Sequence, residues 1–227
     1  MTQSLTPAEL EQLRAFSTPT ISNAIETFGV RSRTEGFMDP TIVCRTPTLG
    51  RMCGYAVTAR IRASAPPERA VGHRDVWREF EKVPKPWVVV VEDADYPHPV
   101  GSWWGEVNAS TYTALGAVGA VTNGGVRDLP ETRALGFHFF SAHVLVSHAY
   151  VHVVEAGGEV RVGGLTVRPG DLLHADQHGI TTVPAAIAGE LAAAALDIER
   201  GERELIDYAQ SIDIDLEVLA RKYGKVD

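Results

Sequence analysis

Two acidic residues and one arginine carry the clearest chemical potential in this sequence: Glu106, Arg127 and Asp128. Each stands where a predicted strand gives way to a helix, Glu106 at the start of a helix over 106–115 and the other two after the pair Gly124-Gly125. In open parallel sheets, ligands bind beyond the carboxyl ends of the strands, where loops run into helix N-termini. We therefore expect the three side chains at one rim of a sheet, where they could bind a metal ion and an anionic substrate.

Each of these residues also has a purely structural explanation. Asp128, with Pro130 and Glu131 behind it, has the pattern of an N-cap in a capping box. Glu106 near a helix N-terminus would be favoured by the helix dipole. Arg127 is unfavourable in that position, although an ion pair with Asp128 would be reason enough for it. The spacing alone leaves a functional site and a structural role equally open.

The middle of the chain has a β-α-β-α-β pattern. Its β-branched run at 87–92 is typical of a buried parallel strand, and consecutive strands of this kind imply parallel neighbours with right-handed crossovers. The predicted elements are, in order, a strand over 87–92, a loop over 93–104, a helix over 106–115 closed by Gly116, a strand over 117–122, a tight turn over 124–128, a helix over 129–135 closed by Gly136 and a strand over 137–140.

Shorter elements flank this unit. Thr6-Pro7-Ala8-Glu9 is a capping box that predicts a helix, and Gly163-Gly164 marks the bend of a predicted hairpin over 160–167. The others are a helix over 19–28 capped by Ser17 or Thr18, a strand over 55–61, a helix over 69–81, turns at 169–171 and 176–179, a helix over 184–208 and a short helix ending at Tyr223. We expect a single α/β domain over residues 1–227, with a central parallel unit, flanking helices and a C-terminal β-hairpin region.

Histidines and cysteines give no convincing metal site. His148, Tyr150 and His152 alternate as on a strand and would share one face, but no third zinc ligand follows at a suitable spacing, so a structural or surface role is favoured. Cys44 and Cys53 are too few for a disulfide framework and are expected to be small buried apolar residues. Trp103 and Trp104 could form an apolar wall of the site or pack in the core or a subunit interface.

The composition excludes several classes of protein. The chain has 227 residues, 44% of them hydrophobic and 22% charged, and a net charge of −8, which argues against nucleic-acid binding. No leader and no apolar stretch of membrane-spanning length is present, so we expect a cytoplasmic protein. The sequence lacks a phosphate loop, a nucleophile elbow and a dinucleotide fingerprint, and no glycine-rich cofactor loop supports a methyltransferase.

Three segments, which follow one another in the family's order along the chain, resemble the family that includes the regulator of ribonuclease E activity A and the 4-hydroxy-4-methyl-2-oxoglutarate aldolases. The most specific segment is Gly105–Asn108 (GEVN) followed by Gly124–Asp128 (GGVRD). The others are Ser17–Glu26 (STPTISNAIE) with Gly54–Thr58 (GYAVT), and Gly163–Leu172 (GGLTVRPGDL) with Ala175–Gly179 (ADQHG) and Pro184. Together they span most of the chain.

The resemblance implies a class II-type lyase fold, a homotrimer or hexamer with sites between subunits, and a motif of an acid, twenty residues and Arg-Asp. Glu106 and Arg127 stand in that relation. By this likeness Asp128 binds Mg²⁺ or Mn²⁺, Glu106 holds a metal-bound water, and Arg127 binds the substrate. The backbone amides of Gly105, Glu106, Val107 and Asn108 would receive its carboxylate. The chain departs from the pattern in having Ser102 where the family has glycine, with Gly101 beside it, and Glu rather than Asp at 106.

The implied function is a divalent-metal-dependent lyase that cleaves a carbon–carbon bond of a 2-oxo acid through a pyruvate enolate, by retro-aldol cleavage or by decarboxylation of oxaloacetate. The alternative is a non-enzymatic regulator of the ribonuclease E type. Some of those regulators lack part of the acid/Arg-Asp set, which is complete here. Only the aldol route needs a general base, and the sequence does not identify it. Glu35 or Asp39 of a neighbouring subunit is a candidate.

Overall fold

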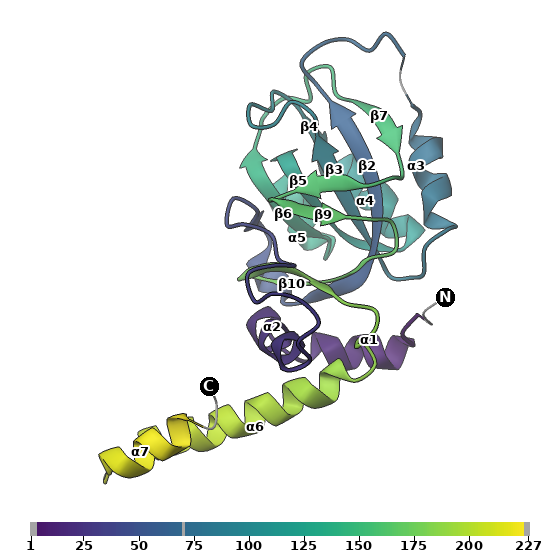
Figure 1. Cartoon of the computed structure of the whole chain (residues 1–227). Helices are drawn as coiled ribbons and strands as arrows, with labels where there is room; N and C mark the ends of the chain where they lie inside the picture. The colour runs from purple at the N-terminus through teal and green to yellow at the C-terminus, as the bar shows by residue number, and fades with distance from the viewer. Residues whose placement is uncertain (1–3, 70, 225–227) are drawn as a thin grey trace.

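A computed structural model describes residues 4–69 and 71–224 and shows one sheet with helices packed around it (Figure 1). The sheet has the strand order β1-β6-β5-β3-β2-β10-β11, with β4 paired to β5 and β7 paired to β2. Its strands are β1 (Val43–Cys44), β2 (Met52–Arg62), β3 (Trp87–Asp93), β4 (Ser102–Trp104), β5 (Ala117–Val126), β6 (His138–Val144), β7 (His152–Ala156), β10 (Leu172–Asp176) and β11 (Gly179–Val183). The strands β8 (Val160–Val162) and β9 (Leu165–Val167) form a separate hairpin.

The centre of the sheet is parallel: β2 pairs β3, β3 pairs β5, and β5 pairs β6. Along β3, Val89 and Val91 pack in one apolar cluster while Val88 and Val90 pack in the other. All four valines are fully buried, because the sheet is covered on both faces. The predicted α/β fold class and its β-α-β-α-β parallel unit are therefore confirmed.

Helices cover one face of the sheet and a hairpin covers the other. The helical face includes α3 (His73–Phe80) and α4 (Glu106–Leu115), which bury Val76, Phe80 and Tyr112 against the strands. The opposite face is closed by β8 and β9 together with Met38 and Ile42. The remaining helices are α1 (Pro7–Arg14), α2 (Thr18–Thr27), the short 3₁₀ turn η1 (Pro47–Leu49), α5 (Leu129–Ala134), α6 (Leu191–Ala209) and α7 (Leu216–Tyr223).

Local capping chemistry fixes several of these boundaries. Thr6 and Glu9 form the predicted reciprocal capping box of α1, and Ser17 accepts from the Thr20 amide at the start of α2. The helix α4 begins at Glu106 as predicted, and it ends at Gly116, which has a φ of 107°. A residue with a side chain is strained at such a φ, so glycine suits this helix end.

The predictions of a loop over 93–104 and of a tight turn over 124–128 are both wrong. Residues 102–104 of the predicted loop form β4, because the hydroxyl of Ser102 lies 2.8 Å from the carbonyl of Gly125 and β4 pairs with β5 there. Gly124 and Gly125 belong to β5 rather than to a turn. They are needed for close packing: a Cβ at Gly124 would lie 2.6 Å from Asp93 Oδ2, and one at Gly125 would lie 2.4 Å from Leu145 Cδ1.

Three further predictions need correction. The helix expected over 69–81 begins at His73, and residue 70 lies outside the described residues. The helix expected from Pro184 begins at Leu191, after a series of turns. His148 and Tyr150 lie outside any strand, and only His152 starts β7, so the expected alternation on one strand is wrong.

The last two helices extend away from the body (Figure 1). Along the 19 residues of α6 only Leu191 and Ala195 are buried, both near its start, where α6 packs against α2. No helix in the described ranges 4–69 and 71–224 is long and apolar enough to cross a membrane.

A buried polar cluster beside α1 and α2 connects residues 13–18 with residues 174–178. His174 Nε2 lies 3.1 Å from the carbonyl of Leu13, which can only accept, so Nε2 carries the proton and Nδ1 accepts from the Thr18 hydroxyl at 2.9 Å. Asp176 accepts from the Thr18 amide and from the His178 amide, both at 2.8 Å. Burial lowers the pKa of His174 to about 4, so this imidazole is neutral.

Candidate active site

A pocket of about 380 Å³ opens where β4 and β5 end and α4 begins. It brings together Arg127, Asp128 and the N-terminal turn of α4, as the topology of parallel strands predicts. The remaining wall comes from the start of α3 and from the segment between β6 and β7. The lining residues are Val71, Gly72, His73, Ser102, Trp103, Gly105, Val107, Asn108, Arg127, Asp128, His148, Val151, His152 and Val153.

Asp128 is held in an unusual backbone conformation, with φ 53° and ψ 46°, which costs on the order of 1 kcal/mol outside glycine. Its carboxylate makes no capping hydrogen bond to α5, so the capping-box explanation is wrong. Instead, Oδ2 accepts from the amide of Glu106 at 2.9 Å, at the N-terminus of α4. A Cβ at Gly105 would lie 2.5 Å from that oxygen, so glycine is needed at 105 for this approach.

Arg127 and Asp128 form the expected ion pair, with Nε 3.6 Å from Asp128 Oδ2. Each side chain keeps more than a third of its surface exposed, so the pair contributes little to stability. Nη1 of Arg127 lies 3.5 Å from the carbonyl of Val146, a long contact that leaves its donors free to bind another group. The ion pair therefore positions the guanidinium at the pocket without saturating it.

Glu106 contacts Asp128 through its backbone amide, and its side chain does not line the pocket. The side chain is exposed and does not line the pocket, while its amide is already engaged by Asp128. The next two residues, Val107 and Asn108, do line the pocket, and the N-cap residue of α4 is Gly105, which has no side chain to cap their amides. A helix N-terminus with free amides is a suitable partner for a carboxylate.

The donor set fits a hard cation that keeps water ligands. Asp128 supplies a carboxylate whose Oδ2 is taken by the Glu106 amide, which leaves Oδ1 for another partner. No group of three or more His, Cys, Asp or Glu residues that could hold a metal ion occurs among residues 4–69 and 71–224. Mg²⁺ is commonly bound through only one or two carboxylates together with substrate oxygens and water. A single carboxylate beside an open pocket therefore suits Mg²⁺ or Mn²⁺ and is unsuited to a structural zinc ion.

Three histidines in the pocket wall were not predicted as residues of this site. The ring of His73 stacks on Trp103, with centroids 5.6 Å apart, while His148 and His152 approach from the segment before and at the start of β7. The alternation of 148 and 152 was a sequence signal for a shared location, but it pointed to a strand face. Their actual proximity comes from a loop, which periodicity does not predict.

The two tryptophans lie in different places, one at the pocket and one in the core. Trp103 lines the pocket, whereas Trp104 is fully buried and packs on Tyr112, Phe137 and Phe139. Asp39, one of the residues considered as a base, binds the amide of Thr41 and does not line the pocket of its own chain.

The chain belongs to the RraA-like family, whose model, described as Aldolase/RraA, matches residues 18–182. This match shows the family that the sequence segments resemble. The family includes both 4-hydroxy-4-methyl-2-oxoglutarate aldolases and inhibitors of RNA processing.

Two curated relatives match parts of the chain. Protein DlpA of Legionella pneumophila is 26% identical over 107 residues, which are 46% of this chain and 17% of DlpA. A putative 4-hydroxy-4-methyl-2-oxoglutarate aldolase of Halalkalibacterium halodurans is 31% identical over 71 residues, which are 31% of this chain and 34% of the relative. The chain thus matches about a third of the length of one relative and about a sixth of the other.

Solved structures show the same fold over most of the chain. An uncharacterized protein from Pseudomonas syringae pv. tomato superposes with a TM-score of 0.75 at 22% identity, covering 99% of this chain and 97% of that one. RraAS2 of Streptomyces coelicolor, described as an unusual member of the RNase ES inhibitor RraA family, gives 0.70 at 23% identity, covering 88% and 97%. At these identities the likeness establishes the fold alone.

Proposed function

We propose that this protein is a divalent-metal-dependent lyase that cleaves a carbon–carbon bond of a 2-oxo acid and releases pyruvate. The observation that carries the proposal is the convergence of Arg127, Asp128 and the start of α4 on one pocket. A regulator that only binds a partner protein needs no such pocket. The match to a putative aldolase of the same family supports this choice.

The residues divide the work of binding a 2-oxo acid. Asp128 would hold Mg²⁺ or Mn²⁺ through its free oxygen, and this ion would supply the Lewis acid that stabilises the oxygen of an enolate. The amides of Val107 and Asn108 receive the substrate carboxylate at the helix N-terminus. Arg127 donates charge-assisted hydrogen bonds to the oxygens that gain charge as the bond breaks. The water-holding role of Glu106 stays a prediction.

Retro-aldol cleavage and decarboxylation of oxaloacetate both leave the enolate of pyruvate, so one arrangement serves both reactions. The test measures pyruvate release from oxaloacetate and from 4-hydroxy-4-methyl-2-oxoglutarate, with Mg²⁺ or Mn²⁺ and then with EDTA. We expect metal-dependent release above the free-metal rate. In Arg127→Ala we expect it to fall by about 10²–10³-fold with the melting temperature unchanged, because the side chain is half-exposed.

Pyruvate release that EDTA leaves unchanged would contradict the metal, and normal turnover in Arg127→Ala would contradict the site. No release from either substrate, together with binding of a ribonuclease by the wild-type chain and by Asp128→Ala alike, would favour the regulatory alternative. The trimeric or hexameric assembly and the cytoplasmic location that we expect stay predictions, and light scattering would measure the first.

A further inference from the structure

Two histidines of the pocket wall have the same fixed tautomer. Nδ1 of His148 lies 2.9 Å from the carbonyl of Ala149, and Nδ1 of His152 lies 2.8 Å from the carbonyl of Tyr150. A carbonyl oxygen can only accept, so in each neutral ring Nδ1 carries the proton. Nε2 is then left with a lone pair, and both residues line the pocket. A ring held in this way at Nδ1 is suited to accept a proton at Nε2.

The two histidines belong to different segments of the chain. The segment that carries His148 runs directly beside the Arg127 strand end: the Leu145 amide donates to the carbonyl of Val126 at 3.0 Å, and Val146 contacts the Arg127 guanidinium. The carbonyl of Ser147 then accepts from the amide of Ser102, which lines the same pocket. The segment that leads to His148 thus contacts both the end of β5 and the start of β4. His152 instead begins β7 and pairs with Arg62 of β2.

Close packing fixes the backbone that presents His148. A Cβ at Gly101 would lie 2.4 Å from the carbonyl oxygen of His148, so only glycine at 101 lets the two segments come this close. The same carbonyl accepts from the Val151 amide at 2.9 Å. The ring itself is exposed, so its Nε2 can reach a bound molecule without a rearrangement of the core.

The other charged or titratable groups of the pocket are less suited to this task. One oxygen of the Asp128 carboxylate is bound by the Glu106 amide and the other is assigned to the cation. Arg127 has no lone pair to accept a proton. The ring of His73 is stacked on Trp103.

We propose that His148 is the general base of the retro-aldol reaction, an assignment that rests on the proposed lyase function. Nε2 of His148 accepts the proton of the 4-hydroxyl group, the bond between C3 and C4 breaks, and C4 becomes the carbonyl carbon of the first product. The electron pair of the broken bond forms the enolate of pyruvate. The same proton then returns from Nε2 to C3, which yields pyruvate and restores the neutral ring. No oxidant, reductant or further reactant is needed.

The test exploits the two reactions of one site. Decarboxylation of oxaloacetate removes no hydroxyl proton, so His148→Ala is expected to keep it within about 3-fold of the wild type. Retro-aldol turnover should fall by about 10²–10⁴-fold, the usual contribution of a general base. Added imidazole should restore part of the lost retro-aldol rate, because the exposed position of His148 lets a small base enter. His152→Ala is the matched control, because His152 has the same tautomer but lies on β7, which pairs with β2, and this variant should keep both rates within about 3-fold.

A binding measurement separates the base from a structural role. Oxalate, which resembles the enolate of pyruvate, should bind the magnesium-loaded His148→Ala variant with the wild-type affinity in calorimetry. An equal loss of both activities, weakened oxalate binding, a loss in His152→Ala as large as in His148→Ala, or no rescue by imidazole would overturn the assignment. A wild type that decarboxylates oxaloacetate without cleaving the hydroxy acid would also overturn it and leave the lyase intact. A wild type without either activity would remove the proposed function itself.

Discussion

Two polar clusters of this molecule contain similar residue types but differ in how many of their polar atoms have hydrogen-bond partners. In the cluster beside α2, both nitrogens of His174 and both oxygens of Asp176 have hydrogen-bond partners within the protein. In the pocket at the other end of the parallel strands, Arg127, Asp128 and His148 each line the pocket and keep polar atoms that their contacts within the described residues do not use. The first cluster has its binding capacity satisfied by the chain, and the second has capacity left for a ligand.

This difference assigns separate roles to the segments that carry the family likeness. The segments at 17–26 and 175–179 meet in the buried cluster, where Thr18 and Asp176 are 158 residues apart in the chain. The segment at 105–128 forms the pocket. One family segment therefore holds two parts of the chain together, and another lines a pocket. The two cases are distinguished by whether the polar atoms already have hydrogen-bond partners within the chain.

The largest expected effect is on turnover in the pocket. Asp128→Ala should lower kcat/KM by about 10³-fold or more, because the proposed cation loses its protein ligand. The free energy of unfolding should change by only about 1 kcal/mol, because one hydrogen bond to the Glu106 amide is lost. Metal-dependent pyruvate release and calorimetric unfolding measure the two quantities. A large loss of stability would show that Asp128 belongs with the structural residues.

The reverse result is expected in the buried cluster. Asp176→Ala leaves the amides of Thr18 and His178 without their acceptor and should cost about 2–4 kcal/mol of unfolding free energy. For a chain of this size, that corresponds to a fall in melting temperature of roughly 5–15 °C. The kcat of the protein that remains folded should equal the wild-type value at a temperature well below the transition. A specific loss of turnover without a loss of stability would contradict the comparison.

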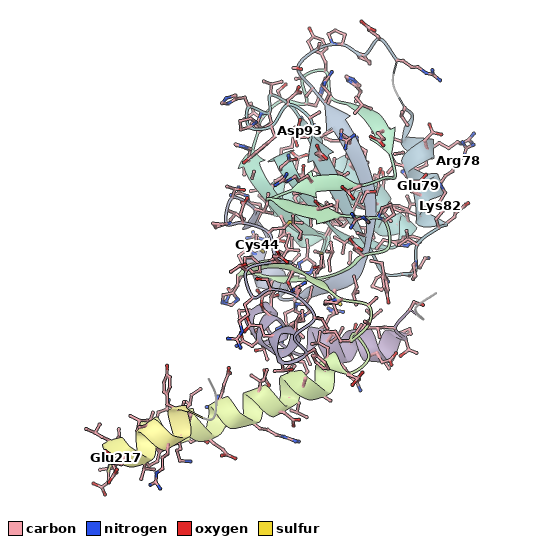
Figure 2. The ribbon with its side chains drawn as sticks, viewed as in Figure 1. Cys44, Arg78, Glu79, Lys82, Asp93 and Glu217 are labelled. Atoms are coloured by element: carbon pink, nitrogen blue, oxygen red, sulfur yellow. The ribbon has the colours of Figure 1, made fainter. Side chains whose placement is uncertain are left out.

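A smaller effect concerns Asp93, the last residue of β3, which is labelled in Figure 2. It is almost fully buried, yet Oδ2 has no partner among the described residues. Burial, with the nearby Asp95 carboxylate, raises the pKa of Asp93 to about 6. The folded state therefore binds this proton more tightly than the unfolded state, so the stabilisation is present at low pH and is lost as pH rises from about 4 to 6.

Asp93→Asn removes this dependence. Compared with the wild type, the variant should gain about 1–2 kcal/mol of unfolding free energy between pH 4 and pH 6, with no further change above that. Denaturant unfolding at a series of pH values, with the Asp95→Asn variant as a control, would measure it. Parallel curves for the wild type and Asp93→Asn would show that an internal water or another partner satisfies Oδ2.

Much of the fold could be predicted because the signals are local. The valine run of β3, the capping box at Thr6 and Glu9, and the helix that ends at Gly116 each depend on residues within a few positions of one another. Of the three side chains predicted at one rim, Arg127 and Asp128 line the pocket together with the start of α4, because parallel topology determines which strand ends meet, whereas the Glu106 side chain does not line it.

The errors have one physical cause, which is contact between distant segments. Gly124 and Gly125 are typical of a turn by local rules, but they lie in a strand because Asp93 and Leu145 pack against them. The carboxylate of Asp128 binds the start of α4 rather than α5, since its backbone conformation directs it there. His148 reaches the pocket through a loop whose path depends on Val126 and Ser102.

The hydrogen bond between Thr18 and Asp176 can form only late in the synthesis of the chain. The apolar side of α2 packs on α6, β10 and β11, all of which lie beyond residue 171. At about 5–20 residues per second, a ribosome needs on the order of 8–30 s to extend the chain from Thr18 to its partner 158 residues later. For that interval Ile21 and Ile25 lack the partners that bury them in the finished protein. A nascent-chain binding factor that recognises short apolar segments would have its longest opportunity there.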